Sequence, residues 1–403
     1  MDMRNEVLTK RTRLTSWITL ACFFLGGALG LLLPQMFEYI AFIGTAYISL
    51  LKLMALPIVV CTVFNAASRG ARSASRAMAK SVLLFAAMFA ISFALCGALF
   101  SILSPGAGFS LTEGELWAGS VADLSLDGFF RSVFSDNVFA SLTGGAMLPC
   151  ILFAFCMGIA AERVHAERVI AFVSELEAVF SRMLSYVLYL TPLGVFVLMG
   201  RCTSGFGADA LKGALSYVLC AWGGSVLVLL LVMILPLWLF LRINPLTYFR
   251  KMGRVLLTAL STCSSAATLP ETLRTCREEF DVPERVSGVV APLGCTIHMC
   301  GGAVSFSLLG LFVMQMTGRP VTVGLFLWML LLAELLNMAA PGIPGGGIVL
   351  GATFLNLLGM PDVGLFLGMY AGIYRILDMS YTSLNVAGDV TAVLLIHRWE
   401  QRS

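Results

Sequence analysis

The stretch YRILDMSYTSLNVAGDVTAVLLIHRWEQR, residues 374–402, is apolar enough for a membrane-spanning helix, yet its first half carries strongly polar side chains. These are Arg375, Asp378, Thr382, Asn385 and Asp389, and their steps of three and four residues place all of them on one helical face. An ionised side chain inside a bilayer costs at least about 2.5–3.5 kcal/mol, so this face must meet protein or a wet cavity. We interpret it as a binding site; the alternative is a helix fastened to its neighbours by buried ion pairs.

The composition indicates an integral membrane protein. Of the 403 residues, 59% are hydrophobic and only 12% are charged, with a mean hydropathy of +0.91. Soluble domains carry about 25% charged residues. The net charge of +3 comes without a long basic run, so we expect no nucleic-acid partner. The 11 cysteines show no metal-binding spacing, and we interpret them as packing residues.

Six apolar segments precede the polar stretch, each long enough to cross about 30 Å of hydrocarbon. They cover residues 14–34, 37–65, 78–104, 144–161, 170–200 and 214–241. The loops between them alternate in charge, and residues 105–143 are acidic where the preceding loops are basic. The positive-inside rule then predicts a multi-pass protein of the cytoplasmic (inner) membrane, with both termini in the cytoplasm.

The remaining segments do not read as simple spans. Segment 255–273, VLLTALSTCSSAATLPETL, has basic residues at both ends, which predicts a hairpin that enters and leaves the membrane on one side. Glycines and prolines interrupt segment 331–358 and predict a second hairpin. Between them, GCTIHMCGG at 294–302 predicts local unwinding of a span. Each break alone would indicate a kink, but two in corresponding positions indicate an inverted-repeat transporter with a site at the membrane midplane.

These motifs resemble the dicarboxylate/amino acid:cation symporters, the family of the glutamate and neutral amino acid transporters. The resemblance rests on STCSSAATLP (261–270), AAPGIPGGG (339–347) and LDMSYTSLNVAGD (377–389), which occur in the family's order. It implies an all-α integral membrane protein with eight transmembrane helices, two re-entrant helical hairpins and inverted repeats. It also implies a homotrimer that works as an elevator-type transporter.

The resemblance further implies how the chain is divided. Residues 1–77 would hold scaffold spans one and two, and residues 78–104 the third span, in the transport domain. An extracellular loop and spans four to six would follow in 105–241. Residues 242–403 would form the transport core, with hairpin one, span seven, hairpin two and span eight.

The same resemblance assigns site residues. Asp378 would hold a substrate ammonium and Asn385 its carboxylate. The rest of the substrate pocket would comprise Ser264, Ser265, Gly342, Tyr381 and Thr382. One Na+ site would be formed by Asn385, Asp389 and the carbonyl of Gly294. A second would be formed by Thr296, Met299 and hairpin carbonyls near residues 337–340. Oxygen ligands of this kind suit a hard cation.

The chain departs from the family pattern at the substrate pocket. Tyr381 stands where members that carry acidic substrates have an arginine, so a second substrate carboxylate would lack a partner. We therefore expect a neutral amino acid. Arg375 could reach in from two turns earlier, which keeps acidic substrates open as an alternative. We favour instead that Arg375 pairs with Asp378 or with a hairpin.

A second departure concerns a cation site. The family's Asn-Met-Asp-Gly motif reads HMCG at residues 298–301, and the matching third-span positions are Phe85, Met88 and Phe89. We expect this further sodium site to be absent. His298 and Glu334 are titratable groups at membrane depth, and either could carry a proton in place of the missing sodium. The alternative is a neutral, hydrogen-bonded His298 and a buried, protonated Glu334.

The sequence therefore predicts a symporter that moves a neutral amino acid, coupled to Na+, with H+ left open as a coupling ion. No metal triad, nucleophile–base pair or phosphate loop indicates an enzyme, and we expect no organic cofactor. The expected partners are the amino acid, the lipid bilayer and two further copies of the chain. The alternatives are a glutamate, aspartate or dicarboxylate symporter, or a channel-like ion conductance of the same fold.

Overall fold

The computed structural model describes residues 18–72, 76–107, 133–338, 340, 345–360 and 364–402. Within these ranges the chain forms helices joined by short turns, and no strand occurs. The predicted all-helical class is confirmed for this part of the chain. Five of the described helical stretches are long and apolar enough to cross a membrane, at 41–68, 80–103, 209–241, 284–316 and 366–401. The number of eight spans stays a prediction.

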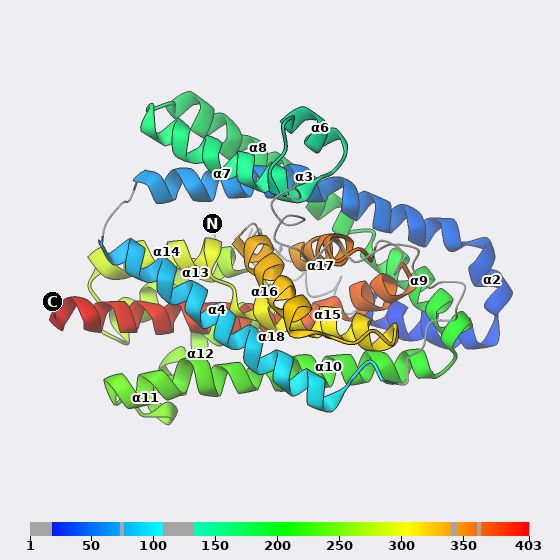
Figure 1. Ribbon diagram of the computed structural model, residues 1–403. Coiled ribbons are helices and arrows are strands. Elements are labelled where there is room, and N and C mark those ends of the chain that lie inside the picture. The colour runs from blue at the N-terminus through cyan, green and yellow to red at the C-terminus, as the bar shows by residue number, and fades with distance from the viewer. Residues whose placement is uncertain are drawn as a thin grey trace, which may run out of the picture.

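Helices α3 (Ala41–Arg72), α6 (Val138–Thr143), α7 (Met147–Arg163) and α8 (Glu167–Leu188) lie together along one side of the molecule, while α4 (Arg76–Leu103) lies with the helices of the second half (Figure 1). Helix α3 packs along α7, α8 and α9 (Thr191–Phe206). Two shorter helices precede α3, at 18–32 and in α2 (Pro34–Tyr39), and α6 precedes α7.

Segment 170–200 differs from the straight span that its apolar composition predicts. It is divided between α8 and α9, whose axes differ by 53°. Pro192 lies in the first turn of α9, where its ring and missing N–H prevent a helix from continuing from α8. The proline was visible in the sequence as a local signal for this bend.

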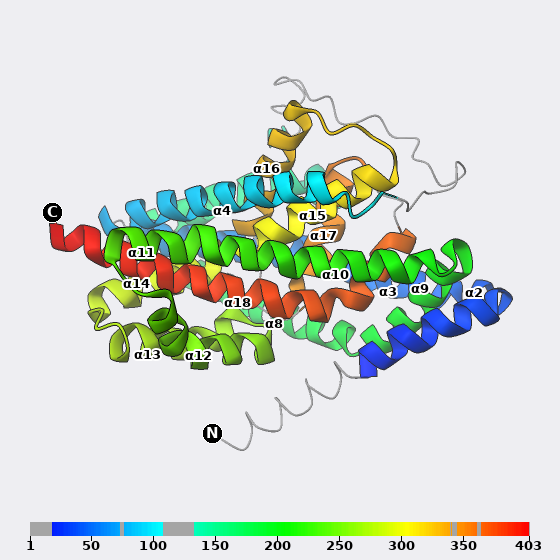
Figure 2. The ribbon, with the colours of Figure 1, turned by 90° about the horizontal axis from the view of Figure 1, so that it is seen from below.

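Helix α18 (Gly364–Arg402) runs through the centre of the second group of helices. It contacts α10 (Asp209–Val228), α12 (Pro245–Thr262), α14 (Glu284–Ile297) and α15 (Cys300–Met316), and also α4 (Arg76–Leu103). Helix α10 continues through a π-helical stretch, Leu229–Ile234, into α11 (Leu235–Leu241). Figure 2 shows α18 between α10 and the pair α12 and α13. This central position encloses the polar face of α18 in protein.

Helices α12 and α13 (Ser265–Glu278) form the first predicted hairpin. At its closed end the hydroxyls of Thr262 and Thr268 lie 3.3 Å apart. At its open end Lys251 donates to the carbonyl of Glu279 and lies 4.9 Å from the centroid of the Phe280 ring. Contacts at both ends require the two helices to be antiparallel. An antiparallel helix pair therefore occupies this segment, and that it is a re-entrant hairpin in a membrane stays a prediction.

The other two predicted interruptions also lie where the sequence placed them. Helices α16 (Val323–Met338) and α17 (Gly346–Leu357) pack against each other on either side of the second break. The glycine–proline tip at 341–344, with the predicted site residue Gly342, lies outside the described residues. Between α14 and α15 the helix is interrupted at His298 and Met299, which have extended backbone conformations.

Close packing of α7 on α3 depends on Gly158. A Cβ at this position would lie 2.4 Å from the carbonyl oxygen of Phe64 and 2.9 Å from the Cβ of Ala67. Gly158→Ala should therefore destabilise the protein by about 1–3 kcal/mol, as overpacking usually does. Thermal unfolding of the purified protein in detergent measures this loss. Gly223→Ala is the matched control, because nothing lies within 4 Å of its added Cβ. Equal melting temperatures for both variants would contradict this packing.

Candidate functional site

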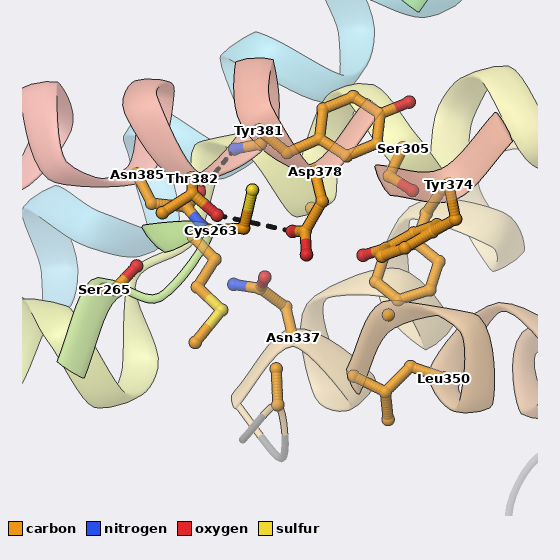
Figure 3. A pocket seen from close by; sticks show the side chains of 16 residues that line it. Cys263, Ser265, Ser305, Asn337, Leu350, Tyr374, Asp378, Tyr381, Thr382 and Asn385 are labelled. Carbon is orange, nitrogen blue, oxygen red and sulfur yellow. Dashed lines mark hydrogen bonds between the residues drawn. The ribbon is translucent and has the colours of Figure 1, made fainter. Parts of the chain in front are cut away.

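A cavity of about 60 Å³ lies where the two hairpins, the break between α14 and α15, and the middle of α18 meet. This is roughly the space of four to six water molecules. Each of these elements contributes lining residues: Cys263, Ser265, Met299, Gly301, Gly302, Ser305, Phe306, Asn337, Ala340, Gly347, Leu350, Tyr374, Asp378, Tyr381, Thr382 and Asn385. The interruptions predicted from the sequence thus converge on one cavity (Figure 3).

The polar face of α18 divides between the cavity and its surroundings. Asp378, Thr382 and Asn385 are buried and line the cavity. Asp389, one turn beyond Asn385, is buried but does not line it. Arg375 is turned to the first hairpin, where its guanidinium donates to the carbonyl of Ser261 at 3.2 Å. The shared helical face is therefore confirmed, but only its middle reaches the cavity.

Asp378 is the acidic group of the cavity. One carboxylate oxygen accepts a hydrogen bond from the backbone N–H of Gly345 at 3.2 Å, and the other accepts from the hydroxyl of Thr382 at 3.3 Å. None of the lining residues is a lysine, arginine or histidine. A buried carboxylate needs a partner of opposite charge or several hydrogen bonds. The arrangement leaves Asp378 able to bind a cationic group from a ligand.

Asn385 holds the interrupted span as well as lining the cavity. Its side-chain oxygen accepts a hydrogen bond from the backbone N–H of Gly301 at 2.7 Å, in the first turn of α15. The two helices approach closely here, since a Cβ on Gly301 would lie 2.3 Å from the carbonyl oxygen of Tyr381. This contact uses the amide oxygen of Asn385, and its amide nitrogen is the group left for a ligand.

The two predicted serines of the first hairpin have different positions. Ser265 begins α13 and lines the cavity. Ser264 is not among the lining residues; it caps α13, and its hydroxyl oxygen accepts from the N–H of Ala267 at 3.1 Å. Cys263, with a left-handed backbone (φ +52°), makes the turn between the helices and also lines the cavity. The N-terminal end of α13 next to the cavity favours a negatively charged ligand group.

Tyr381 lines the cavity with its ring. Figure 3 shows its hydroxyl pointing away from the carboxylate of Asp378. This hydroxyl is buried, and it has no hydrogen-bond partner in the described part of the chain. Tyr381 therefore fills space and brings no charge to the cavity.

Asp389 belongs to a separate polar cluster behind the cavity. Its carboxylate lies 3.0 Å from Nδ1 of His298, and Nε2 of the same ring lies 3.0 Å from the sulfur of Cys300. The ring of Phe85 stacks on the imidazole with 4.5 Å between centroids. His298 is thus hydrogen-bonded, but it lies in the break between helices, not within one.

The other predicted cation ligands have partners of their own. The carbonyl of Gly294 accepts the backbone N–H of His298 at 2.8 Å, and the hydroxyl of Thr296 donates to the carbonyl of Leu293 at 2.8 Å. Met299 lines the cavity. Glu334, the second predicted proton carrier, does not line the cavity, and one of its carboxylate oxygens lacks a hydrogen-bond partner among the described residues. Their roles in ion binding stay predictions.

Several cavity residues escaped the sequence analysis, among them Ser305, Tyr374 and Asn337. Asn337, at the end of α16, was considered only for its backbone carbonyl, but its side chain lines the cavity. The signal was present in the sequence, as a single amide at the end of the apolar run LLLAELLNM.

Comparison with known proteins places these features in a family. The sequence pattern of the sodium:dicarboxylate symporter family matches residues 14–399. The chain is 27% identical to the proton/sodium-glutamate symport protein of Geobacillus stearothermophilus, over 94% of this chain and 93% of that protein. It is 28% identical to the neutral amino acid transporter B(0) of Bos taurus, over 94% of this chain and 76% of that protein. It is 25% identical to the C4-dicarboxylate transport protein of Deinococcus radiodurans, over 93% of this chain and 87% of that protein.

The position of Asp389 depends on the absence of a side chain at Gly294. A Cβ on Gly294 would lie 2.3 Å from the carboxylate oxygen that bonds to His298. Gly294→Ala should break that bond and cost about 1–3 kcal/mol of stability, measured by thermal unfolding. Gly288→Ala in the same helix is the control, since its Cβ would meet only the side chain of Glu284, at 3.7 Å.

In an Asp389→Ala background, the Gly294→Ala change should cost clearly less, because the obstructing carboxylate is gone. An equal cost in both backgrounds would show that Gly294 does not act through Asp389.

Proposed function

Because this chain belongs to the sodium:dicarboxylate symporter family, we propose that it moves a neutral amino acid across the cytoplasmic membrane together with cations. The family comprises symporters, not enzymes, and the long apolar helices make this chain a multi-pass membrane protein. The observation that carries the proposal is the buried carboxylate of Asp378. It faces a cavity whose described lining contains no basic side chain.

An amino-acid zwitterion matches the polar groups of the cavity. Its ammonium group would bind Asp378, which otherwise has only neutral hydrogen-bond donors. Its carboxylate would face the N-terminal end of α13 at Ser265 and the amide nitrogen of Asn385. Burial of either charge without a partner would be costly, and this arrangement supplies a partner for each.

The lining favours a neutral side chain on the substrate. The relatives are named for glutamate, neutral amino acids and C4-dicarboxylates, so the resemblance leaves the substrate class open. A second carboxylate would need a cation, yet the guanidinium of Arg375 is bonded to Ser261 and lies outside the lining. Tyr381 offers no charge at the position of the family's arginine.

Cation coupling is proposed to involve two places. Na+ would bind at Thr296, Met299 and the carbonyls near Asn337 to Ala340. A cation at Asp389 would have to displace Nδ1 of His298, which holds the carboxylate at 3.0 Å. The further sodium site of the family is proposed to be absent, since Phe85, Met88 and Phe89 are buried apolar residues. Gradients of Na+ and H+ imposed separately distinguish the two ions.

The transport movement is proposed from the family resemblance. The two hairpins would re-enter the membrane, and residues 242–403 would move with the span 78–104 against a scaffold in a homotrimer. Both termini would face the cytoplasm.

Uptake of radiolabelled amino acids into liposomes that contain the purified protein tests the function. Wild-type protein should accumulate a neutral amino acid when an inward cation gradient is imposed. Asp378→Asn should lower apparent substrate affinity by at least about 30-fold, because loss of one partner of a buried charge pair costs ~2–5 kcal/mol. Asp209→Asn, the same change at an exposed acid paired with Lys212, should leave uptake unchanged. Normal uptake by Asp378→Asn would show that the amine binds elsewhere.

Counterflow separates a carrier from a channel-like conductance. Liposomes preloaded with unlabelled substrate should take up labelled substrate by exchange if the protein is a carrier. A conductance would produce ion current without such exchange, and would contradict the proposal.

The substrate class can be changed at Tyr381. Tyr381→Arg should introduce uptake of aspartate or glutamate, because the guanidinium supplies the partner that a second carboxylate lacks. Tyr381→Phe should retain uptake of the neutral substrate, since the hydroxyl makes no hydrogen bond within the described chain. If a folded Tyr381→Arg protein gained no acidic uptake in the same liposome assay, the assignment of this position would be wrong.

A further inference from the structure

The side-chain amide of Asn337 has an acceptor that the described chain leaves unused. Asn337 is 1% exposed and lines the cavity. Its amide nitrogen lies 3.5 Å from the carbonyl of Ile297, which fixes the orientation of the amide because a carbonyl attracts the N–H side. The amide oxygen is buried and has no hydrogen-bond partner in the ranges that the structure describes.

The space around this amide oxygen is provided by the glycine opposite. A Cβ on Gly302 would lie 2.4 Å from the oxygen of Asn337. Figure 3 shows the amide projecting from the end of α16 into the cavity, toward Asp378. A buried acceptor without a donor is rare in folded proteins, because each unpaired group carries a desolvation cost. Within the described residues this oxygen is therefore left to pair with a bound group, either a donor on the substrate or the cation proposed at Thr296, Met299 and the carbonyls of residues 337–340.

Different groups around the cavity would bind different parts of an amino acid. Asp378, Ser265 and Asn385 belong to α18 and the first hairpin, and the proposed function assigns them to the ammonium and carboxylate groups. The substrate side chain is then left to face the second hairpin. The other described lining residues of that hairpin, Ala340, Gly347 and Leu350, have no polar side-chain atom. Asn337 is the acceptor on an otherwise apolar wall.

We propose that Asn337 determines substrate specificity by accepting a hydrogen bond from the side chain of the transported amino acid. The substrate would then be a small neutral amino acid with a hydroxyl or amide donor, of the class of serine, threonine or asparagine. This inference rests on the proposed function and names the substrate class of the same site. A site that hydrogen-bonds a hydroxyl discriminates strongly against the analogue without it, because its own polar group is left unpaired.

Serine and alanine test the proposal, because they differ by one hydroxyl group. In liposomes with wild-type protein, serine should have a half-saturating concentration roughly tenfold or more below that of alanine. Asn337→Ala should raise the value for serine by a similar factor and leave the value for alanine within about twofold. Uptake of alanine by the variant then shows that it folds. Asn356→Ala, at an exposed asparagine on α17 of the same hairpin, should change neither value.

Other results would contradict either the role of Asn337 or the proposed function. Equal values for serine and alanine in wild-type protein would disprove the role of Asn337 and leave the proposed function standing. An equal rise for both substrates in Asn337→Ala would show that Asn337 contacts groups common to all amino acids. If Asn337→Ala is inactive, Asn337→Gln, which keeps a neutral amide acceptor, should retain the preference for serine, and its loss would overturn the proposal. Wild-type protein that transports no amino acid would contradict the proposed function itself.

Discussion

The structure depends on pairing the backbone groups that three helix interruptions leave free with the polar face of one continuous helix. A buried backbone group without a partner costs as much as a lost hydrogen bond, and no water replaces it inside a membrane. Helix α18 supplies partners at each interruption. Asp378 accepts from Gly345 at the second hairpin, Asn385 accepts from Gly301 beyond the break in the span, and Arg375 donates to Ser261 at the first hairpin.

The sequence left two interpretations of the polar face of α18 open, a binding site or a means of fastening the helix to its neighbours. These pairings are compatible with both. The face of α18 fastens the interrupted elements to the central helix, and the same elements leave a cavity against its middle turns. Asp378 takes part in both, since its carboxylate bonds to the second hairpin and also faces the cavity. A ligand that binds this carboxylate would therefore act directly on the contact that holds the second hairpin.

The side chains that line the cavity give more information about the substrate class than overall sequence identity does. The relatives are 25–28% identical to the chain and are named for different substrate classes. The groups that we propose to distinguish such classes in this chain are Tyr381, Arg375 and Asn337. Tyr381 and Asn337 bring no charge to the cavity, and the guanidinium of Arg375 donates to the carbonyl of Ser261.

The sequence by itself determined the helical class, the positions of the interruptions and the shared face of Asp378, Thr382, Asn385 and Asp389. These features follow from local rules, since apolar length, helical periodicity and the effects of proline and glycine act over a few residues. The bend at Pro192 follows the same rules, and the apolar composition of segment 170–200 concealed it.

Only the tertiary structure decided which partner each buried polar group has. Asp389 bonds to His298, 91 residues earlier, and so lies outside the cavity, while Asn337 directs its amide into it. Ser264 and Ser265 are neighbours with the same side chain, yet one caps a helix and the other lines the cavity. The physical reason is that a buried polar group pairs with whatever packing brings within about 3 Å, and that packing is set by segments far apart in the chain.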